Sequence, residues 1–410
     1  MSAIHRSDIV IVGGGILGCA IARYLSRTPG ISVTVVERFG LGEQTTSQAA
    51  ALLTRVRPHR SLTTMAMETF RAIDELGEAS GEVLPLRRVG SLQAASGAAG
   101  KQQIEQTAQR AADAGIAAEL IGADESMERA PWLDLSSDTS SLWISDDGYI
   151  DPATLCLAYA ADARRQGVHF LLSQTVRDLL QVGHRVTGVR LANGETLAAG
   201  TVIDAAGPWS VALAKQLGIN LGMAPVRSHY WISAPHHQIP ADGPMTILPD
   251  SGAYARPEVG ALLFGLRDQQ SVVANPGRLP DSLQGFRFDR DPTGELALEA
   301  GYESLRSQVP LLDELRLAHY VSNVSSYTPD GFYLLGDMPG VEGFVAATGC
   351  SGAGIGMSGG IGRLIAEQVT GQIPFVDPDP FRLDRFGVID SYHPDFIRRC
   401  ADARAGKRTG

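Results

Sequence analysis

A chain of 410 residues is longer than one compact core usually allows, so two intertwined domains are expected. The net charge of −10 gives no electrostatic reason to approach phosphate backbones or anionic lipid, which disfavours nucleic-acid binding. No stretch of about 18 consecutive apolar residues occurs, so no membrane span is predicted. The four cysteines lie far apart without a spacing that suits zinc. These features predict no metal site and a cytoplasmic protein that is at most peripheral to a membrane.

The chain opens with a pattern typical of a strand, a helix and a second strand. Residues 8–12 form a continuous apolar run that glycines end, residues 16–27 follow with helical spacing, and residues 32–36 form a β-branched run. A strand, a helix and a parallel strand in this order make one βαβ unit.

The turn between this first strand and the helix reads Gly13-Gly14-Gly15-Ile16-Leu17-Gly18. Gly13 permits the tight turn, Gly15 lets the backbone approach a pyrophosphate, and Gly18 lets helix and strand pack closely. The helix N-terminus adds free N–H groups and partial positive charge. Glu37, nineteen residues after Gly18, ends the second strand, where a carboxylate can accept both ribose hydroxyls and would repel the 2′-phosphate of NADP. The segment therefore predicts a dinucleotide site.

The later elements fall into two groups. Helices are expected over 62–77, 101–114 and 152–166, and strands over 88–94, 168–172, 174–181, 185–192 and 200–205. The Asn193-Gly194 pair predicts a hairpin between the last two strands. The alternating runs 223–232, 243–256 and 260–268 predict an antiparallel sheet. A strand is expected at 343–348 and a helix at 354–370. Their glycine-rich composition resembles that of the first domain, so they are expected to complete it.

A second glycine-rich loop indicates whether the bound dinucleotide is a flavin or a nicotinamide cofactor. Residues 349–354 (Gly-Cys-Ser-Gly-Ala-Gly) follow one strand and enter a helix, and residues 201–209 form another buried strand that ends at a glycine turn. An NAD domain does not need this loop, whereas a helix N-terminus aimed at a reduced flavin would stabilise its negative charge. The pattern favours FAD.

Taken together, these segments resemble the D-amino acid oxidase-like (DAO) family, which includes sarcosine oxidase, glycine oxidase and D-amino acid dehydrogenases. The resemblance runs from Asp8 to about Phe386. It also rests on Thr45-Thr46-Ser47, on 147–152 (Asp-Gly-Tyr-Ile-Asp-Pro), on 205–210 (Ala-Ala-Gly-Pro-Trp-Ser) and on 328–331 (Thr-Pro-Asp-Gly). It implies an α/β fold in which a Rossmann-like FAD-binding domain is interleaved with an α+β substrate domain built on an antiparallel sheet.

The boundaries expected from this division are discontinuous. The FAD-binding domain would comprise 1–85, 145–220 and 325–390, and the substrate domain 86–144 and 221–324. Residues 391–410 would form a C-terminal tail, and its basic residues at 398–399 and 404–408 are interpreted as a solvated terminus.

The resemblance also implies which residues contact the cofactor and the substrate. The expected FAD contacts are Gly13, Gly15, Ile16, Leu17, Gly18, Glu37, Arg38, Thr45, Thr46, Ser47, Val176, Ala206, Gly207, Trp209, Asp330, Gly352, Ala353, Gly354, Ile355 and Gly356. Arg55, Arg227 and Tyr254 are expected to hold a substrate carboxylate, because the fork of an arginine binds carboxylate bidentately. Arg256 and Arg267 are weaker candidates, and His59 and Tyr230 are candidates for shaping the pocket or accepting a proton.

Several positions depart from the family pattern. Asn323 stands where sarcosine oxidases attach FAD through a cysteine, so non-covalent FAD is predicted. Gly356 stands where they carry a lysine for the carboxylate, and residues 262–265 contain no match to their oxygen-activating lysine. A dehydrogenase that passes electrons to a quinone or another carrier is therefore at least as well supported as an oxidase that uses O2.

The expected reaction is the oxidation of a small amine or amino acid. A neutral amine passes the hydride of the adjacent carbon to flavin N5, and the imine is then hydrolysed in water, so the protein mainly orients its substrate. Three alternatives stay open: a 2-hydroxy-acid dehydrogenase with His59 as the base, a flavoprotein subunit of a larger dehydrogenase, and an NAD-dependent enzyme.

Overall fold

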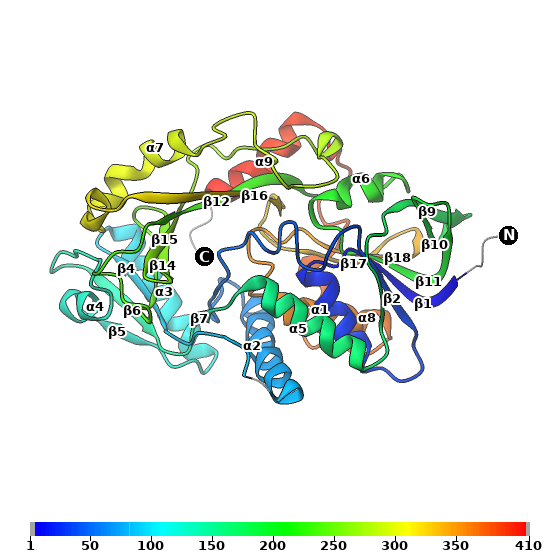
Figure 1. Cartoon of the computed structure of the whole chain (residues 1–410), viewed down its shortest axis with the longest axis horizontal. Helices are drawn as coiled ribbons and strands as arrows, with labels where there is room; N and C mark the ends of the chain where they lie inside the picture. The colour runs from blue at the N-terminus through cyan, green and yellow to red at the C-terminus, as the bar shows by residue number, and fades with distance from the viewer. Residues whose placement is uncertain (1–4, 82, 407–410) are drawn as a thin grey trace.

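The computed structural model describes residues 5–81 and 83–406 and contains two large sheets at opposite ends of the molecule (Figure 1). The first sheet has the strand order β17-β18-β10-β11-β1-β2-β8, with β9 paired to β10. Its strands are β1 (His5–Val12), β2 (Val33–Val36), β8 (His169–Leu171), β9 (Val176–Val182), β10 (Arg185–Leu191), β11 (Thr196–Asp204), β17 (Leu334–Met338) and β18 (Val341–Thr348).

The centre of this sheet is parallel and buried on both faces. β1 pairs in parallel with β2 on one side and with β11 on the other, and β11 pairs in parallel with β18. Val10 and Ile11 are completely buried although they face opposite sides of the sheet. This two-sided burial explains why residues 9–12 form a continuous apolar run, whereas Asp8 before them is exposed. The predicted βαβ unit is confirmed, and so is the hairpin at 192–195, since β10 and β11 pair antiparallel.

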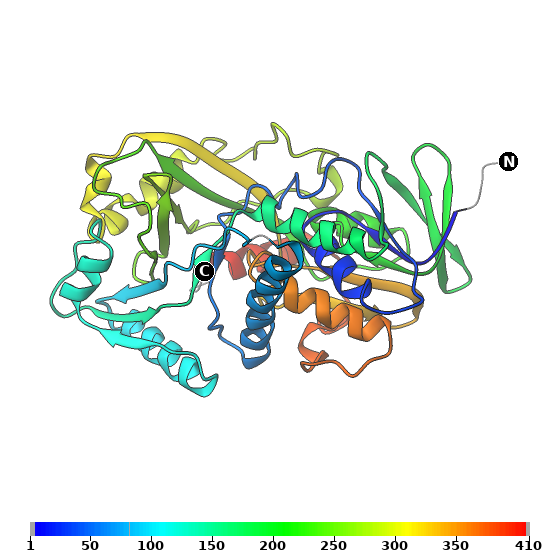
Figure 2. The ribbon, with the colours of Figure 1, turned by 60° about the horizontal axis from the view of Figure 1, so that its bottom comes forward.

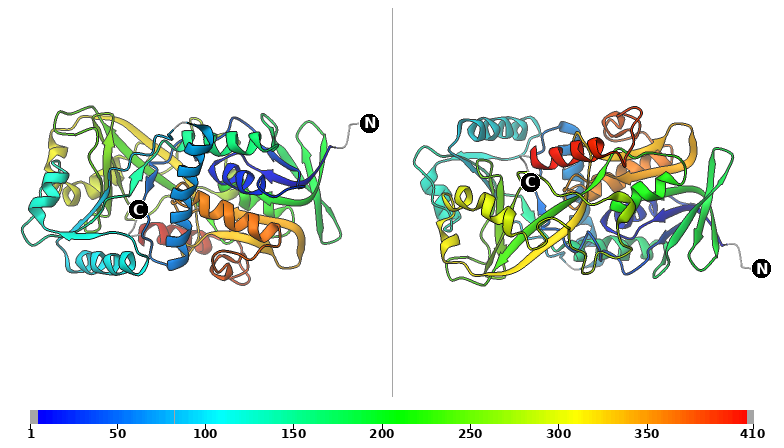
Figure 3. Two further views of the ribbon diagram at one scale, coloured as in Figure 1. Left: turned by 90° about the horizontal axis from the view of Figure 1, so that it is seen from below. Right: turned by 90° about the horizontal axis from the view of Figure 1, so that it is seen from above.

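Four helices pack together beside the first sheet (Figures 1 and 2). α1 (Ile16–Leu25) lies between α5 (Pro152–Arg165) and α8 (Ser358–Val369), and α2 (Arg60–Ser80) crosses α5 and α8. Seen from below, α2 lies between the two halves of the molecule (Figure 3, left). The Asp151 carboxylate caps α5 by accepting the N–H of Thr154 at 2.6 Å, and Pro152 occupies the first turn.

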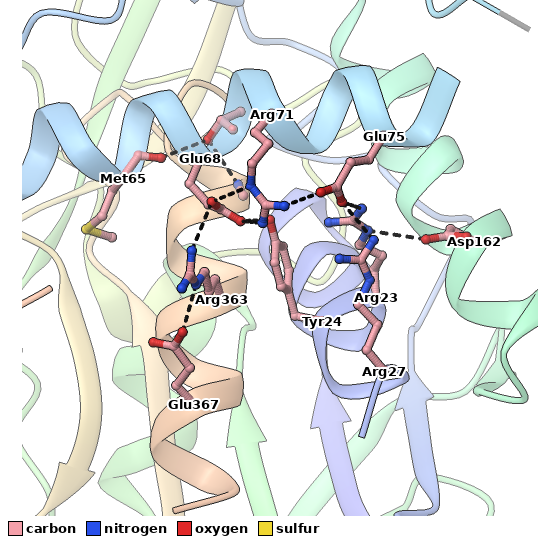
Figure 4. A network of polar contacts seen from close by, with 12 residues as sticks. Arg23, Tyr24, Arg27, Met65, Glu68, Arg71, Glu75, Asp162, Arg363 and Glu367 are labelled. Atoms are coloured by element: carbon pink, nitrogen blue, oxygen red, sulfur yellow. Dashed lines mark hydrogen bonds and ion pairs between the residues drawn. The ribbon is translucent and has the colours of Figure 1, made fainter. Parts of the chain in front are cut away.

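A network of charged side chains joins these four helices (Figure 4). Arg23 of α1 is fully buried and pairs with Glu75 of α2 at 2.6 Å and with Asp162 of α5 at 3.2 Å. The Tyr24 hydroxyl donates to Glu68 of α2 at 2.6 Å, and the same carboxylate pairs with Arg363 of α8 at 3.3 Å. The network therefore holds the four helices against one another.

The second sheet has the order β16-β12-β15-β14-β13-β4-β6-β5 and is antiparallel except for the pair β4 and β13. The antiparallel sheet predicted for 223–268 is confirmed. Its two long strands β12 and β16 run from this sheet toward the first one (Figure 1). The strands are β4 (Ser91–Ala95), β5 (Glu119–Ile121), β6 (Ser140–Ile144), β12 (Ala224–Ser233), β13 (Met245–Leu248), β14 (Ala253–Glu258), β15 (Ala261–Leu266) and β16 (Leu317–Tyr327).

Some elements differ from the sequence prediction. The run 243–256 forms two strands rather than one, because a turn containing Gly252 at φ +64° separates β13 from β14. The last helix of the first domain begins at Ser358 rather than at residue 354, since residues 351–357 form turns. β16 was not predicted. The remaining elements are β3 (Leu52–Leu53) paired with β7 (Gly148–Tyr149), α3 (Ala98–Asp113), α4 (Ala123–Arg129), α6 (Ser210–Lys215), α7 (Glu295–Arg306) and α9 (Pro394–Gly406).

The interpretation of the basic tail residues as a solvated terminus is confirmed for Arg398 and Arg399, which are exposed, but wrong for the buried Arg404, because residues 394–406 are ordered as a helix. These residues form α9, which packs on β12 and β16 (Figure 3, right). Phe396, Cys400 and Arg404 are buried in it, because they recur every four residues and so share one face of the helix. Residues 407–410 lie outside the described residues.

The strands of the two sheets come from alternating stretches of chain. We therefore keep as a proposal the division into 1–85, 145–220 and 325–390 for the cofactor and 86–144 and 221–324 for the substrate. None of the described helices is long and apolar enough to cross a membrane.

Candidate active site

The candidate site lies where the parallel strands of the first sheet end. Val12 of β1 pairs with Val36 of β2 and with Asp204 of β11, and Asp204 pairs with Ala346 near the end of β18. The carboxyl ends of these strands therefore meet at one edge, which is where open α/β sheets bind ligands. A cavity of about 410 Å³ opens there and extends to the second sheet.

The glycine turn after β1 requires glycine for steric reasons. Gly13 has φ +108°, and a Cβ added to it would lie 2.5 Å from the Ala205 carbonyl oxygen. A Cβ on Gly18 would lie 1.9 Å from the Gly13 carbonyl oxygen, so the helix could no longer sit against the turn. Gly13, Gly15, Ile16 and Leu17 line the cavity, whereas Gly18 lies behind it.

The start of α1 offers hydrogen-bond donors to an anion. The Ile16 N–H donates to the Thr46 hydroxyl at 3.1 Å, whereas the N–H groups of Leu17 and Gly18 have no partner among residues 5–81 and 83–406. Free N–H groups at a helix N-terminus favour negatively charged ligands. Thr45 and Thr46 also line the cavity, so the turn and this loop together can hold a pyrophosphate.

Glu37 is placed at the end of β2 as the sequence predicts. Its carboxylate accepts the Gly14 N–H at 2.6 Å and the Phe39 N–H at 2.9 Å, and the side chain lines the cavity. Each carboxylate oxygen accepts more than one hydrogen bond, so Glu37 can still accept a ribose hydroxyl.

Arg38 and Trp209 form the wall of the nucleotide end. The Arg38 guanidinium lies 4.4 Å from the Trp209 ring centre and donates to the Asp281 carbonyl oxygen at 2.9 Å. The Trp209 indole N–H donates to the Pro280 carbonyl oxygen at 2.8 Å. A segment between the second sheet and α7 thus fixes two residues of the first domain, and Val176, Ala206 and Gly207 complete this part of the lining.

Asp204 holds the turn that follows β11. It is completely buried, and its Oδ1 accepts the Ala206 N–H at 3.0 Å and the Ser210 hydroxyl at 2.8 Å. Its Oδ2 has no partner in the part of the chain that the structure describes. Burial raises the pKa of this carboxyl to about 6.

We expect this buried carboxyl to make the protein less stable as pH rises. The folded state holds the Asp204 proton up to a pKa of about 6, whereas the unfolded chain releases it near its ordinary value of about 3.9. Stability from this group is therefore complete below pH 4 and is lost by about pH 7, by up to ~3 kcal/mol. Melting curves at pH 5 and pH 8 should show a smaller pH effect in Asp204→Asn than in the wild type. An equal effect in both would contradict the assignment.

The second glycine loop and the segment after Thr46 surround the middle of the cavity. Gly352, Ala353, Gly354, Ile355 and Gly356 all line it. A Cβ on Gly356 would lie 3.0 Å from the Arg57 guanidinium, so a larger residue here would press on that buried arginine. The position therefore suits glycine, where the resemblance places the lysine of sarcosine oxidases.

Two buried side-chain amide oxygens at this part of the cavity are unsatisfied hydrogen-bond acceptors among the described residues. Gln48 Oε1 and Asn323 Oδ1 accept no hydrogen bond from any described residue, and both residues line the cavity. The Asn323 amide itself donates to the Gln48 carbonyl oxygen at 2.8 Å. Orphaned acceptors are costly in a dry site, and an N–H group of a bound ring would satisfy them. With the glycine turn and Glu37, they fit a cofactor of the shape and polarity of FAD.

The second sheet supplies the other end of the cavity. Tyr230 of β12 and Tyr254 of β14 line it, and the Tyr254 ring lies over Gly265 of β15, where a Cβ would be 2.3 Å from the ring. Burial raises the pKa of both phenols, that of Tyr230 to about 12. Both therefore stay protonated at neutral pH and can donate hydrogen bonds. Arg267 and Arg404 also line this end.

His229 lines the cavity but is fixed as a neutral ring. Its Nε2 lies 3.1 Å from the Leu266 carbonyl oxygen, to which it can only donate, and its Nδ1 lies 3.1 Å from the Tyr320 hydroxyl. Burial lowers the pKa of this imidazole to about 4.

Three expected substrate contacts do not reach the cavity. Arg227 is buried between two carboxylates and pairs with Asp291 at 3.0 Å and with Asp268. Arg55 lies over the Phe70 ring at 4.3 Å and pairs with Asp146 at 3.2 Å. Both guanidinium groups already pair with carboxylates of the protein, Arg227 in the interior and Arg55 near the surface, so neither is a carboxylate anchor.

His59 is the third. It is exposed just before α2, with its ring 5.4 Å from that of Phe332, and it does not line the cavity. Arg256, the weaker candidate, does not line the cavity either and donates to the Ala50 carbonyl oxygen at 3.1 Å.

Besides Gly18, two expected FAD contacts, Ser47 and Asp330, lie outside the cavity lining. The Ser47 hydroxyl donates to the carbonyl oxygens of Glu43 and Gln44, as a local turn residue does. Asp330 pairs with Arg385 at 2.8 Å, which holds the pKa of its carboxyl below the usual value despite partial burial.

Residues 8–368 match the model of the family described as "FAD dependent oxidoreductase" (DAO). The chain belongs to this family. It follows that the cofactor for which the cavity is built is FAD, and that the Rossmann-like fold expected from the sequence is confirmed.

Several related proteins carry the names of enzymes that oxidise amines or amino acids, and another is named as a regulatory subunit of pyruvate dehydrogenase phosphatase. The chain is 26% identical over 394 residues to human mitochondrial dimethylglycine dehydrogenase, covering 93% of this chain and 45% of that protein. It thus spans less than half the length of that relative. It is also 26% identical to glycine oxidase of Geobacillus kaustophilus over 93% of this chain and 97% of that enzyme. The fold matches L-proline dehydrogenase from P. horikoshii with a TM-score of 0.82 at 23% identity, covering 94% and 98% of the two chains.

The sequence prediction missed Arg404 and Gln48 as lining residues. Gln48 follows Ser47 directly, so the loop reaches the cavity one residue later than expected. Arg404 could have been noticed because it continues the four-residue spacing of Phe396 and Cys400.

Proposed function

We propose that this protein oxidises a small amine or amino acid with non-covalently bound FAD. One observation carries the proposal: a single cavity joins the dinucleotide cradle of the first sheet to a pocket of phenols and guanidinium groups under the second sheet. A ligand bound under the second sheet would therefore share one space with the cofactor. The names of the relatives support an amine or amino acid as that ligand.

FAD supplies the acceptor for the hydride that leaves the carbon next to the substrate nitrogen. The protein residues hold and orient. The turn at 13–18, Glu37 and the loop at 352–356 would bind the cofactor, and the protonated phenols of Tyr230 and Tyr254 would orient the substrate by hydrogen bonds and by their ring faces.

The amine must react as the neutral base. In an ammonium group the nitrogen lone pair is bound to a proton and cannot form the C=N bond of the imine as the hydride leaves. His229 does not offer itself as the base, because both of its ring nitrogens are in contact with Leu266 and Tyr320. The 2-hydroxy-acid alternative loses its main support for a related reason: it needs a base near the alcohol, and His59 lies outside the cavity lining.

For the electron acceptor, a quinone or another carrier is at least as well supported as O2. No lysine is present at 262–265, and in the structure Gly265 leaves room for the Tyr254 ring.

Anaerobic titration of the yellow protein tests the proposal. D-, L- and N-methyl amino acids, simple amines and 2-hydroxy acids are added in turn while the flavin absorbance is followed, and air is then readmitted. We expect bleaching by an amine or amino acid, and fast recolouring would identify an oxidase. Acid precipitation should leave the flavin in the supernatant. Bleaching by 2-hydroxy acids alone would overturn the proposal, and a yellow protein that nothing reduces would favour a subunit of a larger dehydrogenase.

A further inference from the structure

The C-terminal helix α9 presents one buried face to the second sheet. Phe396 and Cys400 lie on this face in an apolar cluster with Ala224 and Val226 of β12 and Tyr327 of β16. Arg404 is the next residue at the four-residue spacing, and it is 5% exposed. A guanidinium thus continues an apolar stripe, at the point where the stripe reaches the cavity.

Arg404 is a buried cation whose charge the described protein leaves uncompensated. It forms no ion pair with any residue in 5–81 or 83–406, and its Nε has no hydrogen-bond partner there. The Tyr327 ring, 5.9 Å from the guanidinium, is a weak partner. Its place in the last turn of α9 brings some stabilisation from the helix dipole. The free-energy cost of burying the unpaired guanidinium is much larger than the stabilisation that the helix dipole gives. We therefore expect a bound ligand to supply the compensating charge.

The charges around the cavity show which partner fits. The acidic residues that line it are Glu37, Glu43 and Asp281, and all belong to the nucleotide end, beside the glycine turn, Gly40 and Arg38. The described residues that line the other end include two arginines, Arg267 and Arg404, and no carboxylate. An anionic group on the ligand would supply the missing charge.

We propose that Arg404 binds the carboxylate of the substrate, which makes the substrate an amino acid rather than a simple amine. This inference rests on the proposed function and narrows it. The assignment differs from the one suggested by the family resemblance, because Arg404 lies beyond residues 8–368 and on a helix that the family model does not include. It also gives the role that Arg55 and Arg227 cannot fill, since both already pair with carboxylates of the protein.

The test measures binding of probes that cannot be oxidised. Acetate, benzoate and furan-2-carboxylate are titrated into the FAD-loaded protein, beside the neutral amide of each, and changes in the flavin absorption spectrum report binding. The variants are Arg404→Gln, Arg404→Lys and the control Arg399→Gln, which removes an exposed arginine of the same helix. Melting temperatures verify that α9 stays docked in each variant.

We expect at least one carboxylate to bind the wild type and Arg399→Gln more tightly than its amide does. Loss of a charge-assisted hydrogen bond should weaken carboxylate binding roughly 10- to 100-fold in Arg404→Gln, with Arg404→Lys between the two and amide binding unchanged. If no carboxylate binds the wild type, or if Arg404→Gln binds it as tightly as the wild type does, the proposal is wrong. A shifted flavin potential with unchanged carboxylate binding would also overturn it, by assigning the charge to the flavin.

These outcomes are independent of the proposed reaction. Arg404-dependent carboxylate binding in a protein that no amine reduces would refute the proposed oxidation and leave the anion site standing. Reduction by simple amines as readily as by amino acids, with no Arg404 dependence, would refute the anion site and leave the oxidation standing.

Discussion

Gly13→Ala should yield a protein that is purified without bound FAD. The added Cβ would lie 2.5 Å from the Ala205 carbonyl oxygen, and the residue would have to hold φ +108°. Backbone atoms cannot move aside as the end of a side chain can, so the turn after β1 must shift and carry the N–H groups of α1 away from the pyrophosphate position. The absorbance ratio of flavin to protein, measured after addition of FAD, should fall at least tenfold.

Gly30→Ala is the matched control for this variant. Gly30 also has a positive φ, of +81°, but no atom of the described residues lies within 4 Å of a Cβ placed there. It therefore carries the conformational strain, about 1 kcal/mol, without the collision. We expect Gly30→Ala to bind FAD normally. Equal FAD binding by Gly13→Ala and the wild type would show that this turn does not hold the cofactor.

Arg23→Met should strongly destabilise the protein. Arg23 is fully buried between Glu75 and Asp162, and its removal leaves the Asp162 carboxylate, which is 9% exposed, with the partly exposed Arg165 as its only ion-pair partner among the described residues (Figure 4). Breaking a buried ion pair from one side costs about 3–5 kcal/mol. The loss should appear in the urea midpoint of both the FAD-free and the FAD-loaded protein, because the network joins helices rather than touching the cofactor.

Arg27→Met provides the comparison for Arg23→Met. Arg27 pairs with the same Glu75 at 2.8 Å, but its side chain is 43% exposed. Water screens exposed ion pairs, so this variant should lose no more than about 1 kcal/mol. If the two variants were equally stable, the buried network would not be what fixes α1 against α2 and α5.

The sequence by itself determined the dinucleotide end of the site. Gly13, Gly18 and Glu37 belong to one βαβ unit of about thirty residues, and the glycine pattern and its spacing to Glu37 can be read within that unit. The backbone of such a unit closes in one way, with a parallel pair and a right-handed connection, so spacing alone placed these residues correctly. The antiparallel pattern of 243–268 was readable for a similar reason, since β14 pairs with both of its neighbours in sequence, β13 and β15. The pairing of β12 with the distant β16 was not readable in this way.

Only the tertiary structure decided which cations line the cavity. Arg227 and Arg404 look alike in a sequence, but the fold brings Asp268 and Asp291 to the first and leaves the second without a carboxylate among the described residues. The difference comes from long-range packing: α9 docks on β12 and β16 through Phe396 and Cys400, far from them in sequence. A guanidinium is available to a ligand only where the fold leaves its charge uncompensated, and that depends on contacts which local spacing does not encode.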